Sequence, residues 1–490
     1  MTKYIKIAFN NTILGGIILD TSKEILEQEK FINNIKKINK DKNKKYTILT
    51  MGCQLNENDS EKLCGLVEKM GYIKTENQEE ADLALFNTCC VRENAEDKLF
   101  GKIGELKKIK EKNNTIIAIG GCMMQEKHIT DKIKKSYPFV DIIFGTHTLY
   151  RFSEDLYKVI KNKKRLEDVL DIDGKIYEGL PVKRQSNVQA SVMIMNGCNN
   201  FCSYCIVPYV RGRERSRMPK DIIREIKILA NEGYKEVTLL GQNVNSYLQE
   251  EKRKNIQFEE YEGVNSFATL LKAINKIKKI ERIRFISPHP KDFTDDVIDA
   301  IANCNKVCKL VHLPLQSGNS KVLKDMNRKY TKEQYLNLVE KMKNKTPNLT
   351  LSTDVIVGFP GETNKEFEDT LDVVKKVKFE QVYMFIYSRR VGTPGDKMEN
   401  QILEEEKHMR FNKLKKLVES QIEENNKKYI GKTQKILVEG KSKTNENMLT
   451  GRTESNKVVV FEGNENELKD QIIDVKITSQ HMWYLKGECL

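Results

Sequence analysis

Residues 190–206 read ASVMIMNGCNNFCSYCI, and this stretch decides how the central part of the chain folds. The apolar run at 191–195 predicts a buried strand, and Cys198, Cys202 and Cys205 follow it directly. The C-x3-C-x2-C spacing lets three thiolates converge on one small inorganic core, which suits a [4Fe–4S] cluster with one open iron. Zinc would require a fourth Cys or His nearby, and none lies within about thirty residues. Zinc, a disulfide and ordinary buried thiols remain the alternatives.

Short apolar strands alternate with amphipathic helices from this motif toward the C-terminus. Six strands are predicted, at residues 191–195, 236–240, 282–286, 309–313, 350–357 and 381–386. Helical patterns fill most of the gaps, for example at 220–230, 267–280 and 333–343. Alternating strands and helices imply right-handed crossovers and a parallel sheet. Because a closed TIM barrel needs eight β/α units, six units predict an open, partial (β/α)6 barrel.

A separate parallel-sheet α/β domain is predicted before the barrel. Its strands lie at 46–51, 83–86, 115–119 and 140–144, with helical patterns at 59–70 and 94–110. Cys53, Cys89 and Cys122 each follow one of these strands, in TILTMGC, LALFNTC and IIAIGGC. Parallel strands deliver their C-terminal ends to one edge of the sheet, so these distant cysteines are expected to meet there. The pattern supports a second three-thiolate site, with unrelated buried thiols as the alternative.

The remaining segments carry weaker signals. Residues 1–45 hold ten Lys against five acidic residues and predict a solvated extension, partly helical over 22–37, or a basic arm that reaches RNA. Residues 161–183 read as a linker and 404–428 as a charged connector helix. Period-2 alternation at 434–438 and 457–461, between Gly and Asn turns, predicts a small all-β barrel at the C-terminus. The predicted fold class is therefore α/β, with three folded parts.

Composition narrows the class of protein. A chain of 490 residues suggests about three domains. Its longest apolar runs are shorter than the roughly 20 residues that cross a bilayer, so we expect a cytoplasmic protein with no membrane partner. The net charge is 84 − 70 = +14, which is compatible with a polyanionic partner. Eleven Cys in a reducing compartment favour metal or catalytic thiolates over structural disulfides.

The cysteine motif after the first strand of a partial barrel resembles the radical S-adenosylmethionine superfamily. The resemblance implies that S-adenosylmethionine binds the open iron and that its one-electron reduction gives a 5′-deoxyadenosyl radical. It implies no catalytic side chain beyond the cluster ligands. It assigns S-adenosylmethionine contacts to Tyr204, Gln242, Asn243, Gln316, Ser317, Ile356 and Gly358. Ordinary loop turning is the alternative role of these polar residues and glycines.

Further segments resemble the methylthiotransferase family. These are GCQLNENDSE, NTCCVRENA and GGCMMQ in the first domain, and GQNVNSY, VHLPLQSGNS and GRTESNKVVVF beyond it. The resemblance assigns Cys53, Cys89 and Cys122 to a second [4Fe–4S] cluster. It divides the chain into an extension (1–43), a cluster-bearing N-terminal domain (44–162), a radical core domain (184–426) and a TRAM-like RNA-binding barrel (429–490). Cys90 adjoins Cys89, so local sequence leaves the ligand open, but the N-T-C-x-V-R-E alignment selects Cys89.

Arginines that follow the first cysteine motif predict a path for RNA. Arg211, Arg213, Arg215 and Arg217 alternate in VRGRERSR, and only Glu214 offsets their charge. Guanidinium groups bind phosphates and stack on splayed bases, whereas an internally paired run is the alternative. Nine basic residues balance nine acidic ones in residues 429–490. RNA binding by that segment therefore rests on the resemblance and on three basic residues, Lys441, Lys443 and Arg452.

The family resemblance implies a transferase that adds sulfur and a methyl group at C2 of N6-dimethylallyladenosine, next to the anticodon of tRNA. Residues 54–56 (QLN) and GQNVNSY favour this branch over those that modify threonylcarbamoyladenosine in tRNA or a ribosomal protein. One S-adenosylmethionine would methylate the sulfur and another would generate the radical. We expect a monomer that takes electrons from a flavodoxin or ferredoxin, and the sequence does not identify the sulfur source. The rival from another class is a non-catalytic iron–sulfur protein that binds RNA.

Overall fold

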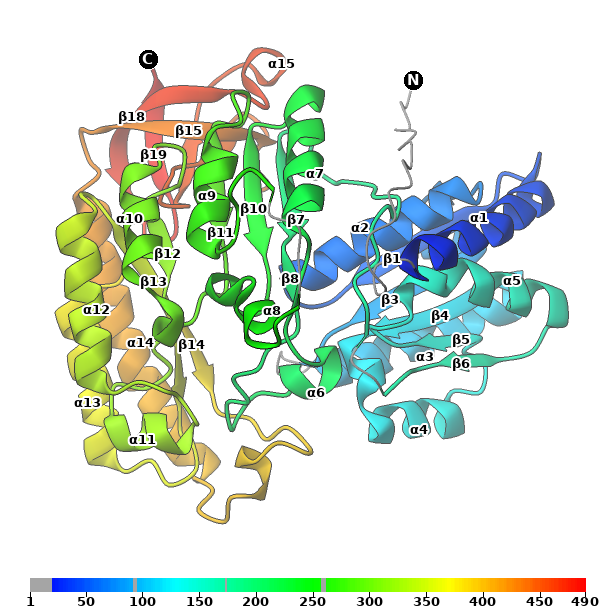
Figure 1. Ribbon diagram of the computed structural model, residues 1–490, viewed down its shortest axis with the longest axis horizontal. Helices are drawn as coiled ribbons and strands as arrows, with labels where there is room; N and C mark the ends of the chain where they lie inside the picture. Colours follow the sequence, from blue (N-terminus) through cyan, green and yellow to red (C-terminus); the bar gives the residue numbers. More distant parts are fainter. Residues whose placement is uncertain (1–19, 91–94, 172–173, 257–260) are drawn as a thin grey trace. The chain divides into compact units, whose positions relative to one another are not determined.

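The computed structural model describes residues 20–90, 95–171, 174–256 and 261–490. The chain forms two compact units, which contain mainly residues 1–185 and 186–490 (Figure 1). The chain crosses between them around the cysteine motif. Residues 196–199 and 206–215 belong to the first unit, and residues 200–205 belong to the second.

The first unit contains a six-stranded, fully parallel sheet, whereas the sequence predicted a parallel sheet with only four of these strands, β1, β3, β4 and β5. The strand order is β2-β1-β3-β4-β5-β6. The strands are β1 (Lys45–Thr50), β2 (Ile73–Lys74), β3 (Leu83–Thr88), β4 (Ile116–Gly121), β5 (Ile142–Phe144) and β6 (Leu166–Asp168). Strand β6 lies within the segment that was expected to be a linker, so part of that expectation is wrong. The physical reason is that β6 pairs in parallel with β5 and extends the sheet.

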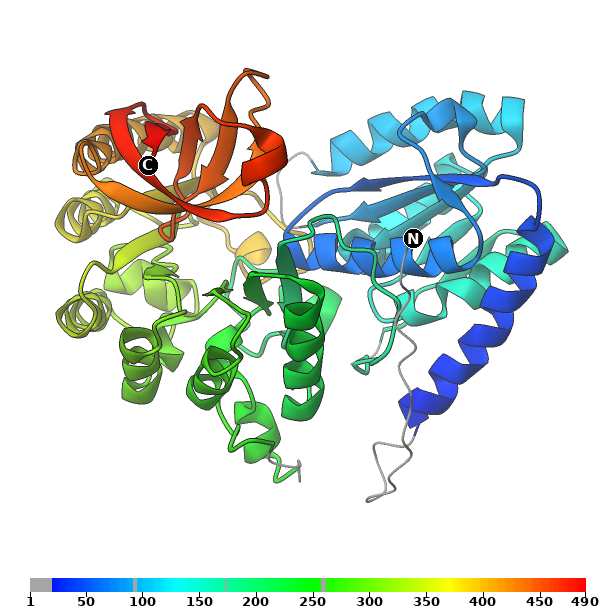
Figure 2. The same ribbon diagram turned by 90° about the horizontal axis from the view of Figure 1, so that it is seen from above.

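Helices cover both faces of this sheet (Figure 2). Helices α1 (Asp20–Asn39), α2 (Gln54–Lys69) and α5 (Phe152–Asn162) pack on one face, and α3 (Ala95–Asn113) and α4 (Lys127–Ser136) pack on the other. The predicted helix in the basic extension is therefore present, but it is not simply solvated. Ile32 and Ile35 bury one side of α1 in the core, which is the pattern of an amphipathic helix. Residues 1–19 of the extension lie outside the described residues.

The second unit contains the six predicted parallel strands of the open barrel. They form two ladders, β11-β10-β7 and β12-β13-β14. The strands are β7 (Gln189–Met193), β10 (Glu236–Leu240), β11 (Arg282–Phe285), β12 (Leu310–His312), β13 (Thr350–Val357) and β14 (Gln381–Ile386). The ladders meet where Ile283 N donates to Lys306 O (2.7 Å) and Cys308 N donates to Ile283 O (3.0 Å).

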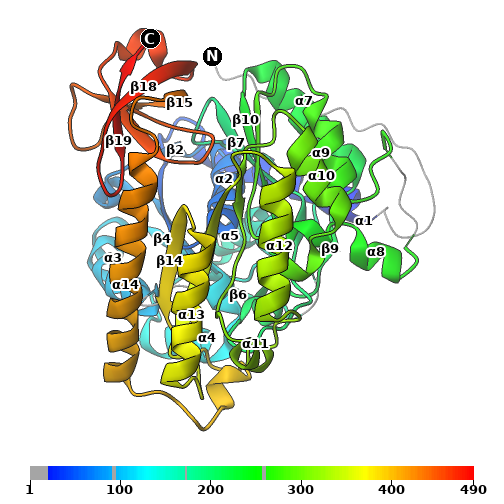
Figure 3. The same cartoon turned by 90° about the vertical axis from the view of Figure 1, so that its left-hand side faces the viewer.

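Six long helices pack on the outside of these strands (Figure 3). They are α7 (Pro219–Glu232), α9 (Phe267–Asn275), α10 (Asp295–Asn303), α12 (Lys332–Lys345), α13 (Asn364–Val377) and α14 (Glu404–Lys427). Helices α9, α12 and α13 each begin with a capping box, which satisfies otherwise unpaired backbone donors. Helix α14 is more than a connector, because Leu414, Val418 and Ile422 are buried in the barrel core.

The C-terminal segment is a closed five-stranded barrel in the order β15-β16-β17-β19-β18. Its strands are β15 (Thr433–Lys441), β16 (Leu449–Arg452), β17 (Val458–Phe461), β18 (Ile472–Gln480) and β19 (Leu485–Cys489). Two arginines of β11 bind its backbone: Arg282 Nη2 donates to Lys435 O (2.7 Å), and Arg284 Nη2 donates to Thr453 O (2.9 Å). Within the described residues, no helix is long and apolar enough to cross a membrane.

Candidate functional site

Cys53, Cys89 and Cys122 lie at the C-terminal edge of the first unit's sheet. Thr50 pairs with Asn87 and Thr88 pairs with Gly121, so the three strands end together. The glycines that precede Cys53 and Cys122 permit the ends of neighbouring strands to approach each other closely. Gly52 has a φ of +130° and Gly121 has a φ of +100°. A Cβ on Gly52 would lie 2.7 Å from Cys89 Cβ, and a Cβ on Gly121 would lie 2.4 Å from Thr88 O. A larger residue would push these strand ends apart.

Asn56 links two of these cysteines. Its Oδ1 lies 3.9 Å from Cys53 Sγ and 3.7 Å from Cys122 Sγ. Its Nδ2 donates to Met51 O (3.0 Å) and Thr88 O (2.7 Å), which fixes the buried amide between β1 and β3. The sequence did not single out Asn56 as a site residue, because an Asn near the start of a helix is usually a capping or turn residue.

The surroundings of Cys122 favour a thiolate. Arg211 Nε donates to Cys122 Sγ at 3.2 Å, and Arg211 Nη2 forms an ion pair with Asp59 Oδ2 at 2.7 Å. The Cys90 thiol donates a hydrogen bond to Cys122 and, with the Arg211 charge, holds the pKa of Cys122 below its ordinary value. Cys90 also packs with Cys122, Ile206 and Val210 in one apolar cluster. Cys90 therefore lies in direct contact with Cys122.

The donor atoms at this sheet edge are cysteine sulfurs. Among the described residues, no three His, Cys, Asp or Glu side chains are arranged to hold one metal ion. In a [4Fe–4S] cluster the thiolates bind different irons, so their sulfur atoms need not converge on one point. Three cysteine thiols at one sheet edge are donors of the kind that hold such a cluster.

Cys202 and Cys205 of the central motif lie in the second unit, beside a buried arginine. Arg328 Nη1 donates to Cys202 Sγ (3.3 Å) and approaches Tyr204 Oη (3.4 Å). Cys205 N donates to Cys202 O (2.9 Å), which forms a tight turn between the two cysteines. Cys198 belongs to the first unit, where its backbone N donates to Gly212 O (3.1 Å). No sequence pattern pointed to Arg328, because it lies 126 positions from Cys202.

Several predicted S-adenosylmethionine contacts have side chains suited to a ligand. Within the described residues, the buried Gln242 Oε1 and Gln316 Oε1 have no hydrogen-bond partner. Such acceptors fit the ammonium and hydroxyl donors of the cofactor. Tyr204 and Ile356 pack on one apolar cluster around Phe359 and Tyr387, which suits an adenine ring.

Three other predicted contacts are held by the protein itself. Asn243 Nδ2 donates to Asp292 Oδ2 (2.9 Å). Ser317 is fully buried, and its Oγ lies 3.4 Å from Thr370 Oγ1. Gly358 has φ +75, and a Cβ there would lie 2.4 Å from Lys407 Cγ. Ser317 and Gly358 therefore shape the loops, whatever their role toward a ligand.

The four arginines of VRGRERSR have different environments. Arg211 is buried at Cys122, and Arg217 is buried with Nη1 donating to Met193 O and to Glu225 Oε2 (both 2.7 Å). For these two, the internally paired alternative describes the structure, because their donors bind protein groups. Arg215 Nη2 donates to Arg211 O (2.9 Å). Arg213 is exposed.

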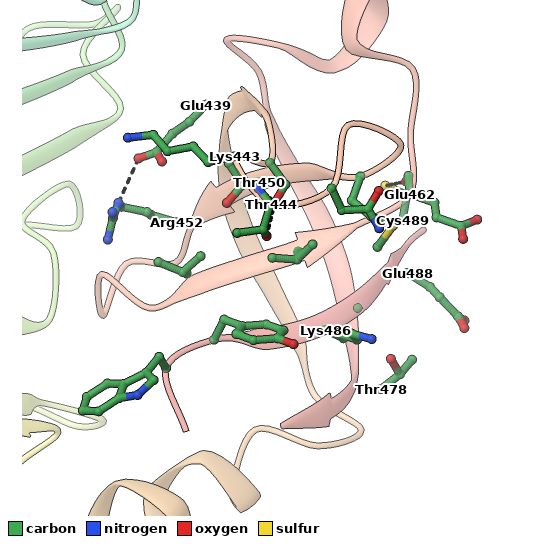
Figure 4. A pocket seen from close by; sticks show the side chains of 18 residues that line it. Glu439, Lys443, Thr444, Thr450, Arg452, Glu462, Thr478, Lys486, Glu488 and Cys489 are labelled. Atoms are coloured by element: carbon green, nitrogen blue, oxygen red, sulfur yellow. Dashed lines mark hydrogen bonds and ion pairs between the residues drawn. The ribbon is translucent and has the colours of Figure 1, made fainter. Parts of the chain in front are cut away.

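The C-terminal barrel carries a groove of about 990 Å³ (Figure 4). Lys443 and Arg452 line it, and Arg452 Nε pairs with Glu439 Oε1 at 2.9 Å. Trp483 also lines this groove and is 59% exposed. A smaller pocket of about 170 Å³ contains Trp483, Arg452 and Tyr383 of β14. Lys441 is exposed at the end of β15.

Family models match three segments of the chain. Residues 45–145 match the uncharacterized protein family UPF0004, residues 192–374 match the radical SAM superfamily, and residues 427–490 match the TRAM domain. The tRNA-2-methylthio-N(6)-dimethylallyladenosine synthase of Clostridium perfringens is 52% identical over 446 residues, which cover 91% of this chain and 97% of that protein. The chain belongs to this synthase family.

Other members of the synthase family match over comparable lengths. The synthase of Acetivibrio thermocellus is 49% identical over 95% of this chain and 96% of its own length. The synthase of Alkaliphilus oremlandii is 50% identical over 96% of this chain and 98% of its own length. Membership confirms the prediction of a radical S-adenosylmethionine transferase whose cofactors are S-adenosylmethionine and [4Fe–4S] clusters.

One solved structure supports the fold. The radical S-adenosylmethionine methyltransferase TsrM from Kitasatospora setae, solved with cobalamin and a [4Fe–4S] cluster, has a TM-score of 0.51 and 14% identity. The match covers 72% of this chain and 77% of TsrM. At this identity the likeness concerns the fold alone.

Proposed function

We propose that this chain inserts sulfur and a methyl group at C2 of N6-dimethylallyladenosine in tRNA. The observation that carries the proposal is the gathering of Cys53, Cys89 and Cys122 at one sheet edge, in a chain that also contains the C-x3-C-x2-C motif and is 52% identical to a named synthase. The N-terminal thiols suit a sulfur-bearing cluster, and the motif suits the cluster that binds S-adenosylmethionine.

In this proposal the six cysteines hold two clusters with different roles. Cys198, Cys202 and Cys205 hold the radical-generating cluster, and Cys53, Cys89 and Cys122 hold the other. When bound, S-adenosylmethionine would supply a 5′-deoxyadenosyl radical and a methyl group. The proposed domain bounds are those expected from the sequence: 44–162, 184–426 and 429–490, after an extension at 1–43. A flavodoxin or ferredoxin as reductant, and a monomeric state, belong to the same proposal.

The cofactor pocket of the second unit is proposed from its acceptors and its apolar wall. Gln242 and Gln316 offer buried oxygens to the methionine ammonium and the ribose hydroxyls. Tyr204 and Ile356 flank the adenine through the apolar cluster that they share. Asn243 and Ser317 keep these loops in place through hydrogen bonds of their side chains within the protein. Gly358 does so through its backbone N, which donates to Glu362 Oε2 (2.8 Å).

The RNA surface is proposed to run over the C-terminal barrel and β14. Lys441, Lys443 and Arg452 provide positive charge. Trp483 and Tyr383 line the same small pocket, and both are exposed, by 59% and 46%. Exposed rings beside basic groups are typical of single-stranded RNA sites, because unpaired bases stack on them.

The Trp483→Ala substitution is expected to weaken tRNA binding. Stacking of a base on an aromatic ring contributes about 1–3 kcal/mol, so the dissociation constant should rise roughly 5- to 150-fold. Binding of tRNA that carries N6-dimethylallyladenosine would be measured at one fixed salt concentration. Met409→Ala removes a comparably exposed side chain, at 61%, and serves as the control. Equal affinity of the Trp483 variant and the control would exclude Trp483 from the RNA surface.

The proposed activity is tested on cellular tRNA. A strain that lacks this gene should accumulate N6-dimethylallyladenosine and lose its 2-methylthio derivative, as measured by mass spectrometry of tRNA nucleosides. Re-expression of the chain should restore the derivative, because the other steps of tRNA modification are intact. Loss of methylthio-threonylcarbamoyladenosine or of a methylthio-aspartate in a ribosomal protein, with the first nucleoside unchanged, would favour one of the rival branches.

A further inference from the structure

Two consecutive residues of the first unit bind one cysteine from each group. The Arg211 side chain donates from Nε to Cys122 Sγ at 3.2 Å. The next residue, Gly212, accepts from the backbone N of Cys198 at 3.1 Å. Two further hydrogen bonds connect the same two segments of the chain. Asn199 N donates to Glu214 Oε1, and Glu214 N donates to Asn199 Oδ1, both at 3.2 Å.

Arg211 is held rigidly. It is the last residue of the short helix α6 (Val207–Arg211), and only 3% of it is exposed. Its Nη2 donates to Asp59 Oδ2 (2.7 Å) and Asn56 Oδ1 (3.0 Å). The helix is fixed in turn by Thr146 Oγ1, which donates to Val210 O (2.7 Å), and by the packing of Ile206 and Val210 on Cys90 and Cys122.

The partners of the Arg211 guanidinium include one carboxylate and one cysteine sulfur. A buried cation is costly unless it is paired. Asp59 supplies one negative partner, and Nε is directed at a cysteine sulfur instead of a second carboxylate. Hydrogen bonds to ligand sulfurs and nearby charge are among the factors that set the reduction potential of an iron–sulfur cluster.

We propose that Arg211 is a positioning residue for the N-terminal cluster: it holds the Cys122 sulfur against the loop that anchors Cys198, and it raises the cluster's reduction potential. This inference rests on the proposed function, because it requires a cluster at Cys53, Cys89 and Cys122. Reduction adds negative charge to the cluster, so a neighbouring cation stabilises the reduced state more than the oxidised state. Asp59 has the opposite effect, and its carboxylate partly offsets Arg211.

The test measures the potential of the N-terminal cluster alone. The parent chain carries Cys198→Ala, Cys202→Ala and Cys205→Ala, so that one cluster gives the whole signal after anaerobic reconstitution. Redox titration followed by electron paramagnetic resonance then compares Arg211→Met and Asp59→Asn in this background. Arg224→Met, which removes a surface arginine paired with Asp221 at 2.6 Å, is the matched control.

Arg211→Met is expected to lower the potential, with at least a tenfold change in the reduction equilibrium, or about 59 mV for one electron. Asp59→Asn is expected to raise the potential, and Arg224→Met to leave it unchanged. General damage to the site would shift Arg211→Met and Asp59→Asn in the same direction. If Arg211→Met loses its iron while circular dichroism shows a folded chain, the positioning role is supported and the upward shift of Asp59→Asn tests the charge effect.

Two results would overturn the inference. Unshifted potentials in both variants, with a normal cluster in the parent chain, would remove the role of Arg211 and leave the proposed function intact. A parent chain that is folded but binds no iron would contradict the assignment of Cys53, Cys89 and Cys122, and with it both proposals.

Discussion

Replacing Cys198, Cys202 and Cys205 by alanine is expected to lower the iron content from about eight to about four atoms per reconstituted chain. The variant should form neither 5′-deoxyadenosine nor methylthio product, because the open iron that binds S-adenosylmethionine is lost and the later carbon–sulfur bond requires the radical. The iron held by Cys53, Cys89 and Cys122 should stay, since these three thiols lie at the edge of the first unit's sheet and are unchanged in the variant. Iron analysis and anaerobic product assays measure both effects.

Cys304→Ala is the matched control for this triple variant. Cys304 is a buried free cysteine at the end of α10, and it belongs to neither group of three. Its replacement should leave about eight irons per chain. Complete loss of iron from the triple variant would contradict the independence of the two clusters.

Cys89→Ser is expected to remove the N-terminal cluster and all methylthio product, while 5′-deoxyadenosine formation continues. The barrel thiolates and their open iron are unchanged in this variant, so the reductive cleavage of S-adenosylmethionine does not depend on Cys89. The methylthio group, however, loses the metal site from which it is transferred. Iron content should fall from about eight to about four.

Cys90→Ser is the natural control, because it changes the adjacent residue. Cys90 is buried against Cys122, Ile206 and Val210, and its thiol donates a hydrogen bond to Cys122, which a serine hydroxyl can replace. The variant should keep both clusters and most of its activity. The reverse outcome, with Cys90→Ser losing the cluster and Cys89→Ser keeping it, would show that the adjacent thiol is the ligand.

The sequence predicted the features that depend on local pattern. Apolar runs followed by GC or TC placed Cys53, Cys89 and Cys122 at strand ends, and parallel pairing brings those ends to one edge. The six strands of the partial barrel were predicted from apolar runs that alternate with helical patterns, and the C-terminal barrel was predicted from period-2 alternation. Strands β2 and β6 were missed because each is short and neither is a continuous apolar run, unlike the equally short β5.

Contacts between distant parts of the chain could not be predicted in this way. Arg211 reaches Cys122 and Asn56 across 89 and 155 positions, and Arg328 reaches Cys202 across 126. In a sequence, a run of four alternating arginines looks like a surface for phosphate. Only the structure shows that Arg211 and Arg217 are buried and bound to protein groups, while Arg213 remains exposed.

Under the proposed function, the two groups of cysteines have unequal roles. The most direct test quantifies 5′-deoxyadenosine and 2-methylthio nucleoside in the same anaerobic reaction, with the Cys89→Ser chain, an electron donor and tRNA that carries N6-dimethylallyladenosine. We predict 5′-deoxyadenosine without methylthio nucleoside. Methylthio nucleoside formed at a rate near that of the intact chain would contradict the assignment of Cys53, Cys89 and Cys122 to sulfur insertion.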